Sequence, residues 1–161
     1  LWLASQFPHA ELCSVEPHPT LARTLRRTLE RNAVRSTVIE AALAPTDGQA
    51  TLHLGALSTT HSLHADAPLS GIGSVVVDTV SMPTLLSQLG WEELDLLKLD
   101  IEGGEAELLA GSPLWLRRVH AIVGELHGDY GPEQLSADLQ PAGFAIAVRR
   151  AARPYLFTAV R

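Results

Sequence analysis

The residue types that could do chemistry are concentrated in one short stretch, Asp100-Ile101-Glu102-Gly103-Gly104. Residues 94–99, just before it, are mostly apolar, as expected of a strand buried in a parallel sheet. Residues 105–110, just after it, are good helix formers. Because adjacent glycines are unfavourable inside a helix, they predict a turn between the strand and the helix. Asp100 would then lie at the carboxyl end of a central strand, where open α/β sheets bind small molecules.

A second interpretation of the same acids is purely structural. Asp100 and Glu102 could cap the following helix and interact with its positive end, which would contribute about 0.3–1 kcal/mol each. Acids at the ends of other strands would favour the binding site over the cap.

Glu16 is the second informative acid, because it ends the strand predicted at residues 11–15. In nucleotide-binding α/β folds an acid in this place binds the ribose, and its two oxygens can accept from both hydroxyls of a vicinal diol. The alternative is an ordinary surface glutamate. A Gly-rich loop is expected about 20 residues before such an acid. Counting back passes Leu1, so we expect that loop and its strand to precede Leu1.

Glu125 and His127 end the strand predicted at residues 119–125. In a parallel sheet, this strand end opens on the same edge as Glu16. His127 could act as a general base, since the ordinary pKa of histidine, about 6.5, suits proton removal near neutrality. Glu125 could orient the imidazole or bind substrate. The alternative is a solvated loop histidine.

His61 and His64 flank Ser62 and resemble a possible metal pair. Their spacing fits no strong zinc signature, so no metal is assigned. Both lie in residues 55–73, which show no clear period, and a loop of that length is usually functional or mobile.

Strands alternate with helices along the chain. Strands are predicted at residues 11–15, 37–42, 49–54, 74–80, 94–99, 119–125, 144–148 and 155–160. Helices are predicted at residues 1–7, 20–31, 81–90, 105–110 and 132–140. This order predicts one α/β domain over residues 1–161, with a doubly wound, mostly parallel sheet and a C-terminal antiparallel hairpin.

Composition narrows the expected partners of the 161-residue chain. The net charge of −6 argues against nucleic-acid binding, and the arginines between positions 23 and 35 are spaced for the solvated face of a helix. No apolar run approaches the roughly 18 residues of a membrane span. The single cysteine, Cys13, cannot form an internal disulfide, which indicates a reducing compartment such as the cytoplasm.

Residues 96–105 (LLKLDIEGGE), followed by Leu108-Leu109-Ala110-Gly111, resemble the signature of the FkbM family of methyltransferases. These are S-adenosylmethionine-dependent enzymes of the Rossmann-like class I methyltransferase fold, linked to O-methylation of sugars and natural products. Further matching stretches, in chain order, are Val15-Glu16-Pro17 with Asn32, Ala42-Leu43-Ala44 with Asp47-Gly48, Ser62-Leu63, Val77-Asp78-Thr79-Val80 and Gly124-Glu125-Leu126-His127. The family's first motif, Asp-x-Gly-Ala-Asn-x-Gly, would lie upstream of Leu1, so the first strand of the fold would be missing from this chain.

The resemblance implies roles for five residues toward S-adenosylmethionine. Glu16 would bind the cofactor ribose, and Pro17 would shape that turn. Ala41 and Ala42 would lie near the adenine. Asp100 would lie near the methionine end and the acceptor.

Methyl transfer is an in-line displacement, so the protein must align the acceptor oxygen and remove its proton. Glu102, Glu125 and His127 are the candidates for deprotonating or positioning the acceptor hydroxyl. The expected activity is O-methylation of a hydroxyl on a sugar or natural-product small molecule. Two alternatives are a nicotinamide-dependent oxidoreductase, which Glu16 would serve equally well, and a non-catalytic methyltransferase-like module that binds a partner through residues 55–73.

Overall fold

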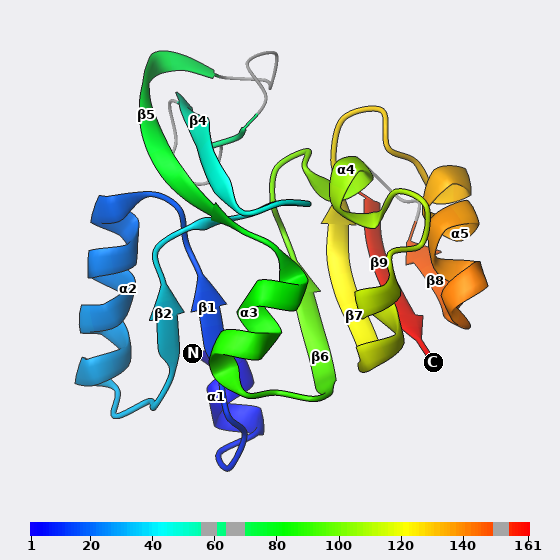
Figure 1. Ribbon diagram of the computed structural model, residues 1–161. Coiled ribbons are helices and arrows are strands. Elements are labelled where there is room, and N and C mark those ends of the chain that lie inside the picture. Colours follow the sequence, from blue (N-terminus) through cyan, green and yellow to red (C-terminus); the bar gives the residue numbers. More distant parts are fainter. Residues whose placement is uncertain (56–60, 64–69, 150–154) are drawn as a thin grey trace.

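The strands form three sheets in the part of the chain that the computed structural model describes, residues 1–55, 61–63, 70–149 and 155–161 (Figure 1). The first sheet pairs β1 (Cys13–Val15) with β2 (Thr37–Ile39). The second has the order β3-β5-β4, with β3 (Ala42–Leu43), β4 (Gly48–Gly55) and β5 (Ser70–Val80). The third has the order β6-β7-β9-β8, with β6 (Leu94–Leu99), β7 (Val119–Leu126), β8 (Ala145–Arg149) and β9 (Tyr155–Val160).

The helices are α1 (Trp2–Gln6), α2 (Pro19–Arg31), α3 (Met82–Leu89), α4 (Glu105–Leu109) and α5 (Pro132–Leu139), with 3-10 turns at η1 (Leu114–Arg118) and η2 (Gln140–Ala142). Sequence signals set the ends of α3: the Ser81 hydroxyl accepts from the Thr84 N–H, and Gly90 ends the helix in the left-handed conformation. None of the helices in the described ranges has the length and apolar character that a membrane crossing requires.

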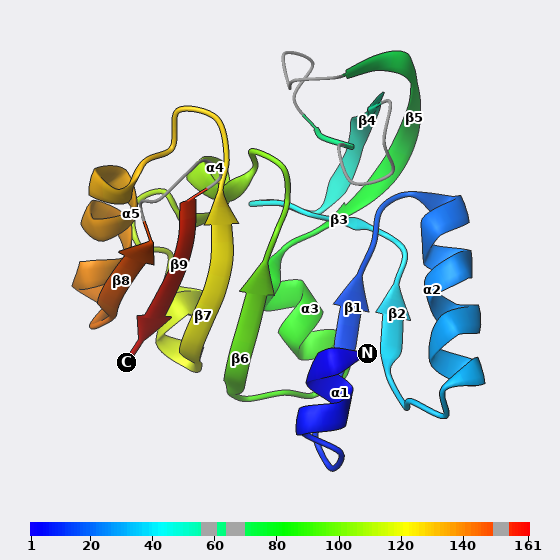
Figure 2. The ribbon, with the colours of Figure 1, turned by 180° about the vertical axis from the view of Figure 1, so that it is seen from behind.

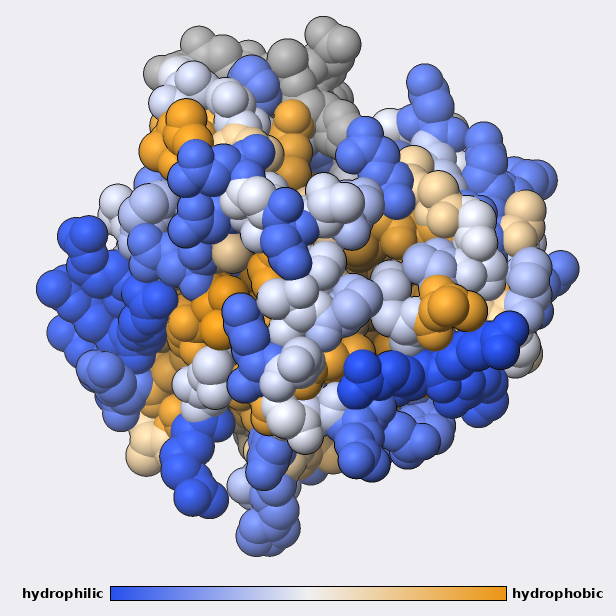
Figure 3. Space-filling model, in the orientation of Figure 1, coloured by the Kyte–Doolittle hydropathy of each residue, from blue (hydrophilic) through white to orange (hydrophobic). Residues whose placement is uncertain are grey.

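Helix α2 carries the arginines that the sequence places on a solvated face. Arg23, Arg27 and Arg31 are exposed, whereas Ala22 and Leu29 are buried. Figure 3 shows strongly hydrophilic residues gathered over this helix. Helix α2 is therefore an ordinary amphipathic surface helix, and these arginines lie on its solvated face.

The expectation of one mostly parallel sheet is not confirmed, because the sheets are mixed. Parallel pairing joins β1 to β2, β3 to β5 and β6 to β7. Antiparallel pairing joins β4 to β5, β7 to β9 and β8 to β9. The C-terminal antiparallel hairpin is confirmed by the last of these pairs.

Most predicted elements match the structure to within two residues, and two differ by more. The strand predicted at 37–42 breaks after Ile39, because the chain bends at Ala41 and then pairs with β5 instead of β1. Residues 70–73, predicted as loop, begin β5, because backbone pairing with β4 extends that strand beyond its β-branched part.

β1 and β6 run in the same direction on either side of a cavity of about 1040 Å³ (Figure 2). Each pairs on one side only, β1 with β2 and β6 with β7. Within the described ranges, no strand pairs with the edges that face the cavity. That a further strand precedes Leu1 stays a prediction.

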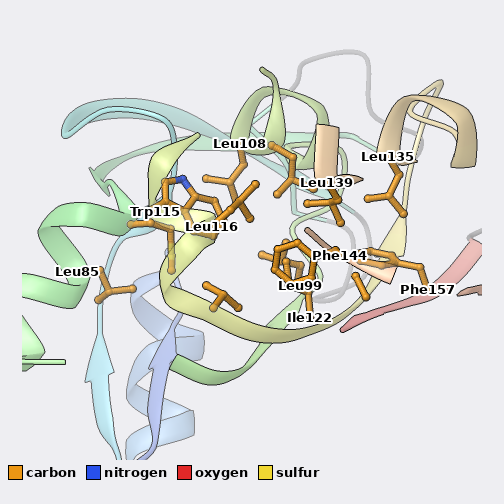
Figure 4. Close-up of a cluster of buried hydrophobic side chains, with 14 of the residues drawn as sticks. Leu85, Leu99, Leu108, Trp115, Leu116, Ile122, Leu135, Leu139, Phe144 and Phe157 are labelled. Atoms are coloured by element: carbon orange, nitrogen blue, oxygen red, sulfur yellow. The ribbon is translucent and has the colours of Figure 1, made fainter. Parts of the chain in front are cut away.

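The main core lies between the third sheet and helices α4 and α5 (Figure 4). Its fully buried side chains include Leu99 on β6, Ile122 on β7 and Leu109 on α4. Burying each such side chain is worth about 1.5–3 kcal/mol. This packing fixes the end of β6 and the start of α4 relative to β7.

Gly124 on β7 allows the third sheet to pack closely. A Cβ at this position would lie 2.7 Å from the Leu99 carbonyl oxygen and 2.7 Å from a ring carbon of Phe157. We expect Gly124→Ala to lower the free energy of unfolding by about 1–3 kcal/mol, because backbone and ring must shift. Urea unfolding measures this change. Thr158→Val, on the exposed face of β9, should stay within about 0.5 kcal/mol of the wild type, and equal stability of both variants would contradict this packing.

Candidate active site

The segment between β6 and α4 is a tight turn, as the two glycines predict. Glu102 and Gly103 both have positive φ, 51° and 107°. The left-handed conformation costs a non-glycine residue roughly 1–2 kcal/mol, so neighbouring contacts must hold it. One such contact is the Ser62 hydroxyl, which donates to the Glu102 carbonyl oxygen at 2.7 Å. Ser62 is itself 1% exposed, so residues 61–63 pack against the turn.

Glu105, the first residue of α4, is fully buried. One carboxylate oxygen accepts from the Gly103 N–H at 3.0 Å, and the other lies 2.8 Å from His127 Nδ1. A buried carboxylate is stable only when it is paired in this way. Glu105 therefore connects the turn after β6 to the chain that follows β7.

The sequence analysis missed the role of Glu105, which it counted only among the helix formers of residues 105–110. A signal was available, because Leu108 and Leu109 lie three and four positions later and are both buried. Residues at this spacing share one face of a helix. An acid on the apolar face of a helix requires a buried partner.

His127 lies among acidic side chains at the carboxyl ends of β6 and β7. Its side chain is 17% exposed, and its Nε2 lies 3.7 Å from a Glu102 oxygen and 3.8 Å from a Glu125 oxygen. Asp100 is close enough that single ligand atoms of Asp100, Glu125 and His127 lie within 4.8 Å of one another. We call Asp100, Glu102, Glu125 and His127 the acidic rim. Because β6 and β7 are parallel neighbours, their last residues meet at one edge.

The surroundings shift two pKa values in the acidic rim. The hydrogen bond with Glu105 is the largest cause of a raised pKa at His127, and partial burial opposes it. Burial is the largest cause of a raised pKa at Glu102, which His127 partly offsets. Glu105, and not Glu125, makes the close contact with the imidazole.

The acidic rim also has the donor types of a cation site. However, Lys98 Nζ lies 2.8 Å from an Asp100 oxygen, and acidic groups often gather at a surface without an ion. We assign no metal to it. Of the other histidine pair, His64 lies outside the described residues. His61 Nδ1 accepts from the Gly55 N–H at 3.1 Å, and the His61 ring lies 5.0 Å from that of His18.

The cavity between β1 and β6 joins the second group of predicted residues to the first. Glu16 and Pro17, which follow β1, line it together with Ala42, Asp100 and Glu102. These residues therefore face a common space at the carboxyl ends of the two strands.

Three predicted residues lie beside this cavity rather than among its lining residues. Ala41 is buried in the main core. Glu125 and His127 belong to the acidic rim. His127 Nε2 lies close to Glu102, which lines the cavity, and to Glu125. On the other side, Glu16 accepts from the His18 N–H at 2.8 Å, which holds its carboxylate at the end of β1.

Acids along the carboxyl edge of parallel strands, beside a cavity, are typical of α/β enzymes that bind nucleotide cofactors. The chain belongs to the FkbM methyltransferase family: the model of the methyltransferase FkbM domain matches residues 3–147. The family predicted from the sequence is therefore confirmed. No curated protein and no solved structure matches the chain. Family membership favours methyl transfer over the oxidoreductase alternative.

The raised pKa of His127 predicts how stability depends on pH. A pKa raised by folding adds stability that is fully present below the unfolded pKa, about 6.5, and is lost as pH rises through the folded value. His127→Gln should therefore destabilise the protein more at about pH 6 than at about pH 9, as measured by urea unfolding. His9→Gln, at an exposed position, is the control and should keep the wild-type dependence. Equal destabilisation by His127→Gln at both pH values would contradict a raised pKa of His127 in the folded protein.

Proposed function

We propose that this domain binds S-adenosylmethionine and transfers its methyl group to a hydroxyl of a sugar or natural-product small molecule. The observation that carries the proposal is the position of Glu16 at the end of β1 and of Asp100 at the end of β6, where both face a common space at the carboxyl ends of the two strands. Family membership supports methyl transfer as the reaction class.

The nucleoside half of the cofactor would lie at the end of β1. The Glu16 carboxylate is already held by the His18 N–H and can accept from the ribose hydroxyls. Pro17 restricts the backbone of this turn. Ala42, 4% exposed and lining the cavity, offers a small apolar surface for the adenine, whereas Ala41 is buried in the main core.

The methionine half would lie toward Asp100, which brings the reacting carbon near the acidic rim. When bound, S-adenosylmethionine supplies an electrophilic methyl group on a sulfonium. The protein then has to orient the acceptor hydroxyl and take its proton. His127 can accept that proton at Nε2 when its imidazole is neutral. Glu102 and Glu125, which lie within 3.8 Å of Nε2, would position the hydroxyl.

The acceptor is proposed to be a small molecule rather than a nucleic acid or a membrane. The net charge of −6 and the carboxylates of the acidic rim suit a neutral, hydroxyl-rich molecule better than a phosphate backbone. The single cysteine supports a reducing, cytoplasmic setting.

Glu16 provides the direct test of cofactor binding. Glu16→Gln in the full-length protein should weaken S-adenosylmethionine binding about 10- to 100-fold, because charge-assisted hydrogen bonds to the ribose are lost. Isothermal titration calorimetry measures the dissociation constant. Glu30→Gln, at an exposed position of α2 away from the cavity, is the matched control and should keep the wild-type affinity. Undiminished affinity in Glu16→Gln, or no binding by the wild type, would overturn the proposal.

A further inference from the structure

We propose that Glu105 is a positioning residue, which keeps the hydrogen of the neutral His127 imidazole on Nδ1. Nε2 is then the acceptor nitrogen, on the side of Glu102 and Glu125. The catalytic meaning of this inference rests on the proposed function, in which His127 takes the proton of the acceptor. The arrangement of atoms stands independently of that function.

The chemistry of the Glu105 carboxylate determines which ring nitrogen of His127 carries the hydrogen. An ionised Glu105 can only accept hydrogen bonds, so the contact of 2.8 Å with His127 Nδ1 requires a hydrogen on that nitrogen. In a neutral imidazole the other nitrogen is then an acceptor. Nε2 is the nitrogen that lies nearest to Glu102 and Glu125.

Burial holds the Glu105 carboxylate in its contact with the imidazole. Glu105 has no exposed surface and therefore cannot exchange the imidazole for water. Its other oxygen is engaged by the Gly103 N–H at 3.0 Å, which limits rotation of the carboxylate. Leu108 and Leu109, on the same face of α4, are buried in the core and hold the helix itself. The acceptor for Nδ1 is thus fixed in place by packing.

Glu105 differs from the other carboxylates around the His127 ring in the atom it contacts. Glu102 faces the imidazole from the turn, Asp100 from the end of β6, and Glu125 from β7. Glu102 and Asp100 also favour the protonated imidazole, but Glu102 and Glu125 lie on the Nε2 side of the ring. Among these carboxylates, Glu105 is the one within hydrogen-bond distance: it lies 2.8 Å from Nδ1, whereas Glu102 and Glu125 lie 3.7 Å and 3.8 Å from Nε2.

Two variants test the role of Glu105. Glu105→Leu removes the acceptor and places an apolar side chain on the apolar face of α4. Glu105→Gln replaces one acceptor oxygen by an NH2 group, which can only donate, so the side chain can no longer present an acceptor oxygen on both sides, to the Gly103 N–H and to His127 Nδ1. Glu107→Gln, at an exposed position of the same helix, is the matched control.

The measurement is long-range ¹H–¹⁵N correlation of the His127 ring in the full-length protein, recorded through a pH titration. The wild type should show Nδ1–H in the neutral form. In Glu105→Leu the neutral form should change to a mixture or to Nε2–H, and the pKa of His127 should fall, because the hydrogen bond that raises it is lost. Glu105→Gln should lower this pKa in the same direction, which keeps the test decisive if Glu105→Leu does not fold. Glu107→Gln should leave the signals unchanged.

An unchanged tautomer and an unchanged pKa of His127 in the folded variants would overturn the inference. This outcome differs from failure of the proposed function, which appears as absence of S-adenosylmethionine binding by calorimetry. A tautomer change without cofactor binding would support the positioning geometry and reject the methyltransferase proposal. Cofactor binding with no tautomer change would support the methyltransferase proposal and reject the positioning role of Glu105.

Discussion

A carboxylate with no contact to solvent constrains the geometry of the whole candidate site. Glu105 must be paired because it is buried, and the two partners it takes come from different parts of the fold. The Gly103 N–H belongs to the turn after β6, and His127 follows β7. One buried side chain therefore sets both the shape of the turn and the orientation of the imidazole, so the acidic rim is assembled by an interaction within the core.

This dependence explains why the glycines around the site matter. Gly103 adopts a φ of 107°, which brings its N–H toward Glu105, and Gly124 leaves room for the Leu99 carbonyl and the Phe157 ring. Both positions need a backbone without a Cβ, one for conformation and one for space. The neighbouring strands can then end close together, and their terminal acids share a single environment.

Local signals predicted much of the fold, whereas contacts between distant residues decided the rest. The turn at Gly103 and the ends of α3 at Ser81 and Gly90 follow from local backbone preferences, and the structure has all three. The break after Ile39 and the early start of β5 depend on which strand pairs with which, and local composition does not encode such pairing. The candidate site shows the same division. The acids at the strand ends could be predicted from their positions. Glu105, the buried partner of His127, lies 22 residues away in the sequence, and no local pattern predicts that pairing.

Among the described residues, side chains join the two sides of the cavity. Helix α3 lies between β1 and β6 in both views (Figures 1 and 2). Met82 and Leu86 from this helix line the cavity. Trp91, just after α3, donates to Glu11 near the start of β1 and so ties the two sides together at the end opposite the acids. Side-chain packing is more readily deformed than a ladder of backbone hydrogen bonds. A ligand that contacts Glu16 and Asp100 together would therefore add a link at the open end, and binding there would stabilise the relative position of the two sheets.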